Sequence, residues 1–133
     1  MSTASALLAA LLAALRADAS LAARLGERIW DTPPRDAAFP HLVVEDLASR
    51  DRSGLDAALD ELRPTLRIAS RTGGRREALT VADRAAEVLL ALPPALDGAR
   101  LVLIRREAVE IRLLKDRLTT EAILRFVALV EPT

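Results

Sequence analysis

The sequence predicts an α+β fold: an antiparallel β-sheet with two main α-helices packed on one face, in a single domain over residues 1–133. Three observations lead to this prediction. The chain begins with a leucine stripe at helical spacing, a second amphipathic stretch lies near its middle, and apolar residues alternate with polar ones elsewhere. A chain of 133 residues is long enough to bury one modest core, which here must be aliphatic because only three residues are aromatic.

The first element is a helix near the N-terminus. Five leucines recur at spacings of three and four residues, which places them on one helix face: Leu7, Leu8, Leu11, Leu12 and Leu15. Asp18 offers a second N-cap, so we expect a kink or a short second helix that ends at Gly26. Residues 27–30 (ERIW) then predict a short strand. The apolar run is too short to span a bilayer, so we expect no association with a membrane.

Three of the seven prolines lie within residues 31–46 (DTPPRDAAFPHLVVED). The first two cannot continue a helix or donate to a β-ladder, so they hold the chain extended between elements. Pro40 restricts Phe39 to extended backbone and precedes a predicted strand at residues 41–47. We therefore interpret the segment as a rigid connector at the edge of the sheet.

The middle of the chain combines a weak signal with a clear one. Residues 48–62 contain a polar loop (SRDRSG) and a stretch, LDAALDEL, that is compatible with two turns of helix. Residues 63–71 alternate, with Leu66 and Ile68 on one face, which is typical of a half-buried antiparallel strand. The glycines of TGG then lead into an amphipathic helix over about residues 75–92, which two prolines terminate.

The C-terminal third is rich in strands. The dipeptide at 97–98 (DG) indicates a tight turn. Strands are predicted in ARLVLIRRE, VEIRLLK and TEAILRFVALVE, and the pair VEIRLL and EAILRFVALV is expected to form a hairpin.

Composition and motifs exclude most chemistry. Nineteen basic and nineteen acidic residues leave no net charge, which argues against a broad nucleic-acid-binding surface. The chain has no cysteine, and its single histidine, His41, opens a predicted strand, where we interpret it as an ordinary structural residue. We therefore predict no enzyme activity, no catalytic residues, no metal site and no cofactor.

One stretch offers a weak alternative function. The sequence TGGRRE joins a strand to a helix N-terminus, where exposed backbone N–H groups favour anions. It lacks the lysine of a phosphate-binding P-loop, and a helix-starting turn explains it better. The alternative to an assembly role is a small α+β module, monomeric or dimeric, that binds an anion or metabolite. Its candidate residues are Gly73, Gly74, Arg75 and Arg76.

Two polar loops suggest association with other proteins instead. Residues 48–62 and 115–120 are rich in arginine and aspartate, and loops of this kind on a compact scaffold are common sites of assembly contacts. The predicted contact residues are Arg50, Asp51, Arg52, Lys115, Asp116 and Arg117.

The order of these features resembles a known family. Its most specific parts here are the LGERIWD block with PPRDAAFPHLVV, the strand LRIASR before GGRREALTVADRAAEVLLAL, and LDGARLVLIRRE before ILRFVALVE. Taken together they resemble the tail terminator, or tail-completion, proteins of long-tailed phages and gene transfer agents. The resemblance covers nearly the whole chain and contains no catalytic motif.

This resemblance implies a function in particle assembly. Such a protein forms a ring, usually of six subunits, that caps the tail tube at full length and presents a surface to the head-tail connector. DNA passes through the lumen without sequence-specific binding. The protein is then expected in the tail or neck of the particle, and in the bacterial cytoplasm during assembly. Phe39 and Pro40 are implied to belong to the scaffold rather than to a site.

Overall fold

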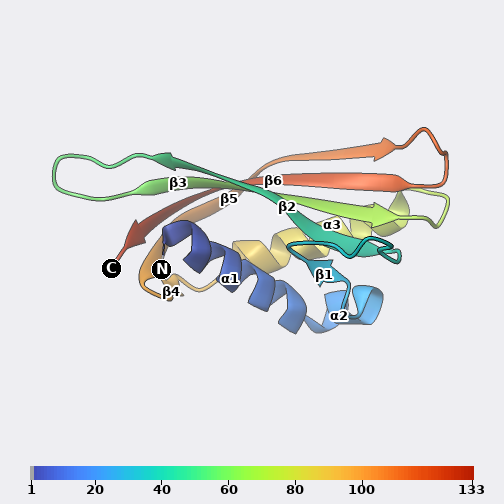
Figure 1. The fold of residues 1–133 in the computed structure, drawn as a ribbon, viewed down its shortest axis with the longest axis horizontal. Coiled ribbons are helices and arrows are strands. Elements are labelled where there is room, and N and C mark those ends of the chain that lie inside the picture. The colour runs from blue at the N-terminus through green and yellow to red at the C-terminus, as the bar shows by residue number, and fades with distance from the viewer. Residues whose placement is uncertain (1) are drawn as a thin grey trace.

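Nine elements follow one another along the computed structural model, which describes residues 2–133. They are α1 (Thr3–Ala17), α2 (Ala19–Leu25), β1 (Ile29–Trp30), β2 (His41–Asp51), β3 (Asp60–Ser70), α3 (Arg76–Leu90), β4 (Ala95–Leu96), β5 (Ala99–Leu113) and β6 (Thr120–Pro132). The strands form one sheet in the order β1-β2-β3-β6-β5-β4. The α+β class is confirmed, and Figure 1 shows the three helices on the lower side of the curled sheet.

The prediction of a purely antiparallel sheet is wrong, because the sheet is mixed. β1 runs parallel to β2, with Ile29 opposite Leu42 and Trp30 opposite Val43, whereas every other described pair is antiparallel. Two antiparallel strands can be joined by a tight turn, but parallel strands need a longer connection. The proline-containing segment 31–40 supplies that connection and returns the chain to the end of the sheet from which β1 started.

Two long hairpins dominate the sheet and project at opposite ends of its long axis (Figure 1). One is formed by β2 and β3, and the other by β5 and β6. No helix forms at LDAALDEL: its first residues lie at the tip of the first hairpin and its last three, 60–62, open β3. Those residues pair with β2 on one side and β6 on the other, and this pairing outweighs the local helical preference.

The C-terminal hairpin is confirmed, although its first strand is longer than predicted. ARLVLIRRE and the first five residues of VEIRLLK belong to one 15-residue strand, β5, which pairs with β6 along its whole length. Register shifts between Leu101 and Leu103 and between Arg106 and Ala108 mark two β-bulges in β5. The predicted turn at 97–98 joins β4 to β5, and Gly98 there has a φ of 73°.

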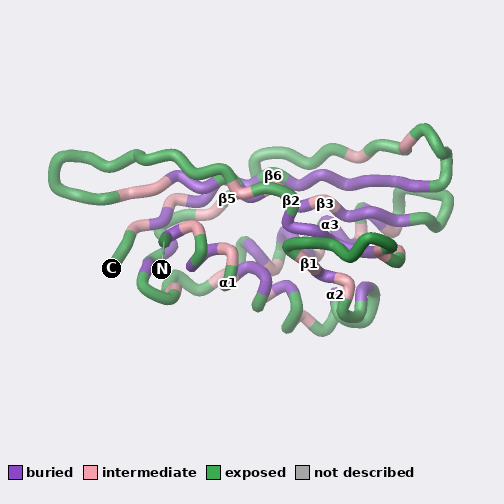
Figure 2. Tube along the Cα trace, viewed as in Figure 1, coloured by how far each residue is buried: buried purple, intermediate pink, exposed green. Residues whose placement is uncertain are grey.

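The core lies between the helices and the lower face of the sheet. Figure 2 shows buried residues concentrated in α1, α3 and the central strands. Leu7, Leu11 and Leu15 of the predicted leucine stripe are fully buried. They belong to one cluster with alternate residues of β3 and β6, including Leu66 and Phe126. No single helix of the described residues is long and apolar enough to cross a membrane, while α1 and α2 together meet the length and composition but are bent by 77°.

Asp18 fixes the bend between α1 and α2. It is the C-cap of α1 and the N-cap of α2, where its side chain accepts a hydrogen bond from the Leu21 N–H at 3.0 Å. The Arg84 guanidinium of α3 donates to both carboxylate oxygens, at 3.0 and 2.5 Å. The hydrogen bonds from Arg84 lower the pKa of Asp18, although partial burial opposes them. One carboxylate thus joins three helices.

We expect Asp18→Ala to lower the free energy of unfolding by about 1–2 kcal/mol, because it removes an N-cap together with a bidentate ion pair. Since the folded state lowers the pKa of Asp18, its contribution is present above pH 3.8 and is lost as the pH falls through the folded value. Urea denaturation at neutral and acidic pH measures both effects. Asp18→Asn keeps the side-chain oxygen that caps α2, so its free energy of unfolding should lie between those of the unaltered protein and of Asp18→Ala. Asp83→Ala, on the exposed surface of α3, is the control and should change the free energy of unfolding little.

Candidate assembly surfaces

The first group of predicted contact residues lies where the β2–β3 hairpin begins to project from the sheet. Asp51 accepts a hydrogen bond from the Ser53 N–H at 2.8 Å, and hydrogen bonds with Ser53 lower its pKa. Arg52 pairs with Glu61 at 3.3 Å, whereas Arg50 is exposed and has no ion pair within residues 2–133. At the tip, Leu55 is entirely exposed. The hairpin therefore presents both charged and apolar groups to solvent.

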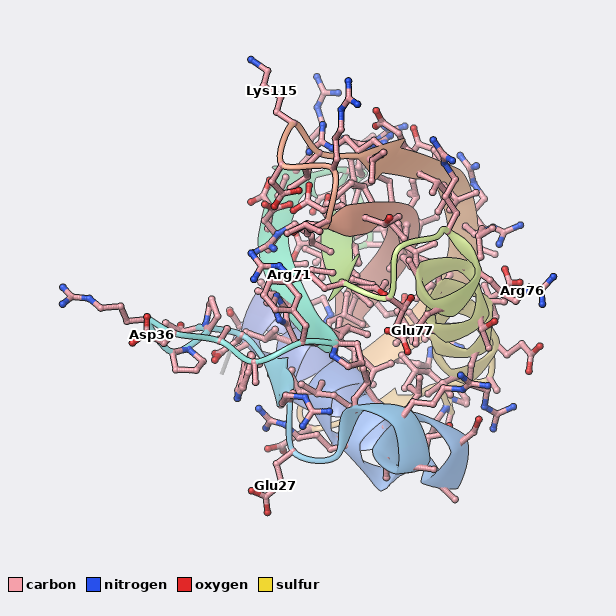
Figure 3. All side chains as sticks on the ribbon, turned by 90° about the vertical axis from the view of Figure 1, so that its right-hand side faces the viewer. Glu27, Asp36, Arg71, Arg76, Glu77 and Lys115 are labelled. Atoms are coloured by element: carbon pink, nitrogen blue, oxygen red, sulfur yellow. The ribbon has the colours of Figure 1, made fainter. Side chains whose placement is uncertain are left out.

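The second predicted group lies at the opposite end of the sheet, in the β5–β6 turn. Asp116 holds this turn: its carboxylate accepts hydrogen bonds from the N–H groups of Leu118 and Thr119, both at 2.9 Å, and these lower its pKa. Arg117 has a left-handed φ of 60°. Figure 3 shows Lys115 projecting away from the body. Asp116 is therefore occupied within the turn, while Lys115 extends into solvent.

The structure thus does not bring the six predicted contact residues into one site. It places them in two groups at the two ends of the long axis of the sheet (Figure 1). Both groups also carry an exposed leucine, Leu55 at one end and Leu118, 60% exposed, at the other. Single exposed apolar side chains are common on protein surfaces, so assembly contacts at these two ends stay a prediction.

The candidate anion residues form the turn between β3 and α3. Gly73 has a φ of 84°, which explains the need for glycine there, and Arg75 is the N-cap of α3 without a side-chain capping bond. Glu77 places its own carboxylate in the first helical turn and accepts a hydrogen bond from the Ser70 hydroxyl at 2.7 Å. Arg76 points away from Arg71 (Figure 3). The turn therefore already contains a carboxylate, that of Glu77. Binding of an external anion there stays a prediction.

A shallow hollow beside the proline segment was not predicted from the sequence. It measures about 540 Å³ and includes the segment's Pro33 and Pro34 together with His41 of β2, Arg67 of β3 and Arg71, which directly follows β3. The Arg71 guanidinium lies over the Phe39 ring, 4.1 Å from its centre. Figure 3 shows the segment around Asp36 projecting from the body beside Arg71. The hollow joins positions far apart in sequence, so local patterns did not reveal it.

His41 is part of the scaffold at the back of this hollow. It is 4% exposed, its Nδ1 lies 2.9 Å from the Ala38 carbonyl oxygen, and its ring lies 4.8 Å from that of Phe39. Burial lowers its pKa, reinforced by Arg67 and Arg28, while the Ala38 carbonyl and Glu121 oppose the change. No group of three or more potential metal ligands occurs within the described residues.

We expect the protein to lose stability as the pH falls below about 6.5, because the unfolded state then binds a proton at His41 more readily than the folded state does. The stability that neutral His41 contributes is lost completely only when the pH lies below the lowered pKa of His41 in the folded state. Denaturation curves between pH 8 and about 5 should show this dependence. His41→Gln should remove it, and an unchanged slope in that variant would show that another group titrates.

Paired charges cover the face of the sheet opposite the helices. Glu61 and Glu121 have side chains only 11% exposed, and each is bound by two arginines at 3.1–3.4 Å. The partners are Arg52 and Arg63 for Glu61, and Arg67 and Arg112 for Glu121. Arg63 also binds Glu107, and Arg125 binds Glu110. Much of the charge on this face is therefore neutralised within the subunit.

Comparisons with known proteins agree with each other. The family described as "Tail completion protein gp17" matches residues 9–131. A chain in the solved structure described as "Virion of native gene transfer agent (GTA) particle" is 27% identical, with 98% of each chain covered and a TM-score of 0.89. No curated protein sequence matches the chain.

Proposed function

Since this chain belongs to the tail completion protein gp17 family, we propose that it caps the tail tube at full length and joins the tail to the head connector, as a ring of six copies. It is a structural protein of a phage or gene transfer agent tail. Its proposed partners are further copies of itself, the tail tube protein and the head-tail connector protein. The bacterial cytoplasm is the proposed site of its assembly.

The observation that carries this proposal is the similarity to a chain of a native gene transfer agent particle, over 98% of both chains. The family match over residues 9–131 includes both projecting hairpins. A protein that sits between a tube and a connector needs two separate surfaces for two different partners. The hairpin ends lie at opposite ends of the subunit and suit that requirement (Figure 1).

The charge distribution supports passage of DNA through the proposed ring. The chain has no net charge, and the carboxylates Glu61 and Glu121 are each paired with two arginines on the sheet face opposite the helices. Long-range attraction of a DNA backbone requires clustered, unpaired positive charge. We propose that this face contacts passing DNA weakly and without sequence specificity.

Electron microscopy of particles from a producer strain that lacks the gene tests the proposal. We expect overlong, irregular tails together with unattached heads. Tails of correct length that stay unattached would limit the protein to joining the tail to the head. Normal infectious particles would contradict the assembly function. Restoration by the plasmid-borne gene is the matched control.

A further inference from the structure

The sheet has an open backbone edge on β2 and on β5, because the outer strands β1 and β4 are only two residues long. At one edge of the sheet, β1 pairs only with Leu42 and Val43 of β2. Residues 44–51 of β2 therefore have no strand on the side that faces away from β3. At the other edge, β4 pairs only with Ala99 and Arg100 of β5, and the Leu101 N–H donates to the Pro94 carbonyl. Residues 102–109 have no strand on that side within the described chain. We name these stretches the β2 window and the β5 window.

The two windows lie at the same level of the sheet. At one end, Asp51 pairs with Asp60, Asp60 with Val130, and Val130 with Leu101. At the other end, a row runs from Val44 through Leu66 and Leu124 to Val109, and the row between them runs from Ser49 to Ile104. The β2 window therefore lies level with residues 102–109, while the open edge of β5 continues to Leu113. A second subunit placed beside the first in the same orientation brings its β2 window next to the β5 window.

The β5 window has the properties of an incomplete interface. In Figure 1, β5 begins beside β4 and reaches the upper margin of the sheet toward its C-terminal end, and all residues of the window except Ile104 are exposed. Val102, Leu103 and Val109 are each 42–47% exposed. A long, apolar, open edge strand promotes pairing with another chain unless charges or bulges protect it. Here two β-bulges interrupt the strand, yet its backbone edge stays open.

Both windows carry charged residues of both signs. Arg105 and Arg106 in the β5 window form no ion pair within residues 2–133. The β2 window carries Asp46, Arg50 and Asp51, which are likewise without an ion pair there, and in the register of the rows above Asp46 faces Glu107. Opposite charges on facing strands stabilise a pair, and like charges oppose it. A second copy of this chain offers the β5 window an open strand at the same level of the sheet.

We propose that neighbouring subunits join edge to edge, with the β2 window of one copy pairing with the β5 window of the next. β2 and β5 point in opposite directions within the subunit, so the new pair is antiparallel and extends the sheet without interruption. The two surfaces differ, and such a contact forms a ring when its rotation closes. This inference rests on the proposed ring, and it names the surface that builds it.

Cysteine cross-linking tests the pairing, because the chain contains no cysteine of its own. Ala48 and Arg105 are both exposed. Ala48 directly precedes Ser49 and Arg105 directly follows Ile104, so they lie beside the two ends of the same row. Facing residues of an antiparallel pair place their Cβ atoms about 4.5–5.5 Å apart, close enough for a disulfide after small movements. Arg105→Cys is combined in turn with Asp46→Cys, Ala48→Cys and Arg50→Cys, which covers shifts of two residues in register.

Assembled particles carrying these variants are oxidised and run on non-reducing gels. We expect at least one pair to give a ladder of covalent multimers up to the full ring, while each single variant stays monomeric. Ala23→Cys, exposed on α2, combined with Arg105→Cys is the matched control and should give no ladder. Monomers alone from all three pairs would overturn the edge pairing. Tail length in the same particles distinguishes failure of the edge pairing from failure of the proposed function. Tails of normal length without cross-links would contradict the edge pairing alone.

Discussion

Charge reversal of Arg50 and Arg52 together, as Arg50→Glu with Arg52→Glu, is expected to impair formation of the ring or its docking on the tail tube while the subunit stays folded. Arg50 has no ion pair within the described residues, and the Arg52 side chain is 54% exposed in its pair with Glu61. Surface ion pairs contribute little to stability, so folding should survive. At an interface, however, charge reversal places like charges together and opposes association strongly.

Complementation of the gene-deleted strain measures this effect. The number of joined particles should fall by at least an order of magnitude, since about 1.4 kcal/mol of lost affinity is already tenfold. Circular dichroism and thermal unfolding of the purified variant verify that it folds. Arg75→Glu with Arg76→Glu is the matched control. Normal infectious particles from the Arg50/Arg52 variant would remove these two residues from the assembly surface.

Phe126→Ala is expected to cause the largest loss of stability of any single substitution considered. Phe126 is fully buried at the centre of β6 and belongs to the cluster that joins the sheet to α1 and α3. Truncation of a buried phenylalanine lowers the free energy of unfolding by about 3–5 kcal/mol. Small domains have only about 5–15 kcal/mol in total, so the variant should be marginally folded or unfolded.

Urea denaturation followed by circular dichroism measures this loss. Leu55→Ala is the matched control, because Leu55 lies fully exposed at the hairpin tip and its truncation should change stability by less than about 0.5 kcal/mol. Equal effects of the two substitutions would contradict the placement of Phe126 in the core. A folded Leu55→Ala subunit is also suitable for testing the hairpin tip in complementation.

Local patterns predicted the elements that depend on periodicity. The leucine stripe of α1 and the apolar face of α3 have helical spacing, and β3 alternates as half-buried strands do, whereas β6 is buried along most of its length. The stretch LDAALDEL has helical spacing too, yet residues 60–62 form strand because β2 and β6 pair with them. The parallel contact of β1 with β2 depends on where the connector returns, which no local pattern encodes.

For the candidate surfaces, too, the sequence predicted the features that depend on local composition and missed those that depend on strand order. The charged tips stood out because arginine and aspartate cluster in loops, and the structure places both at projecting ends (Figure 1). The paired charges around Glu121 join β3, β5 and β6, and the contact of Arg71 with Phe39 spans 32 positions of the sequence. Contacts of this kind depend on strand order and register, so they became visible only in three dimensions.

The seam between β3 and β6 has a consequence for how the chain folds. Each long hairpin pairs residues that are near in sequence, but the seam pairs Ser70 with Thr120 and Asp60 with Val130. Distant pairing requires closure of a long loop first, which slows folding. We therefore expect the two hairpins to form early and the seam to close in the rate-limiting step, when α1 and α3 cover it. A subunit arrested before that step would expose Leu66 and Phe126, so a mutation that delays the seam should cause aggregation before it changes the finished particle.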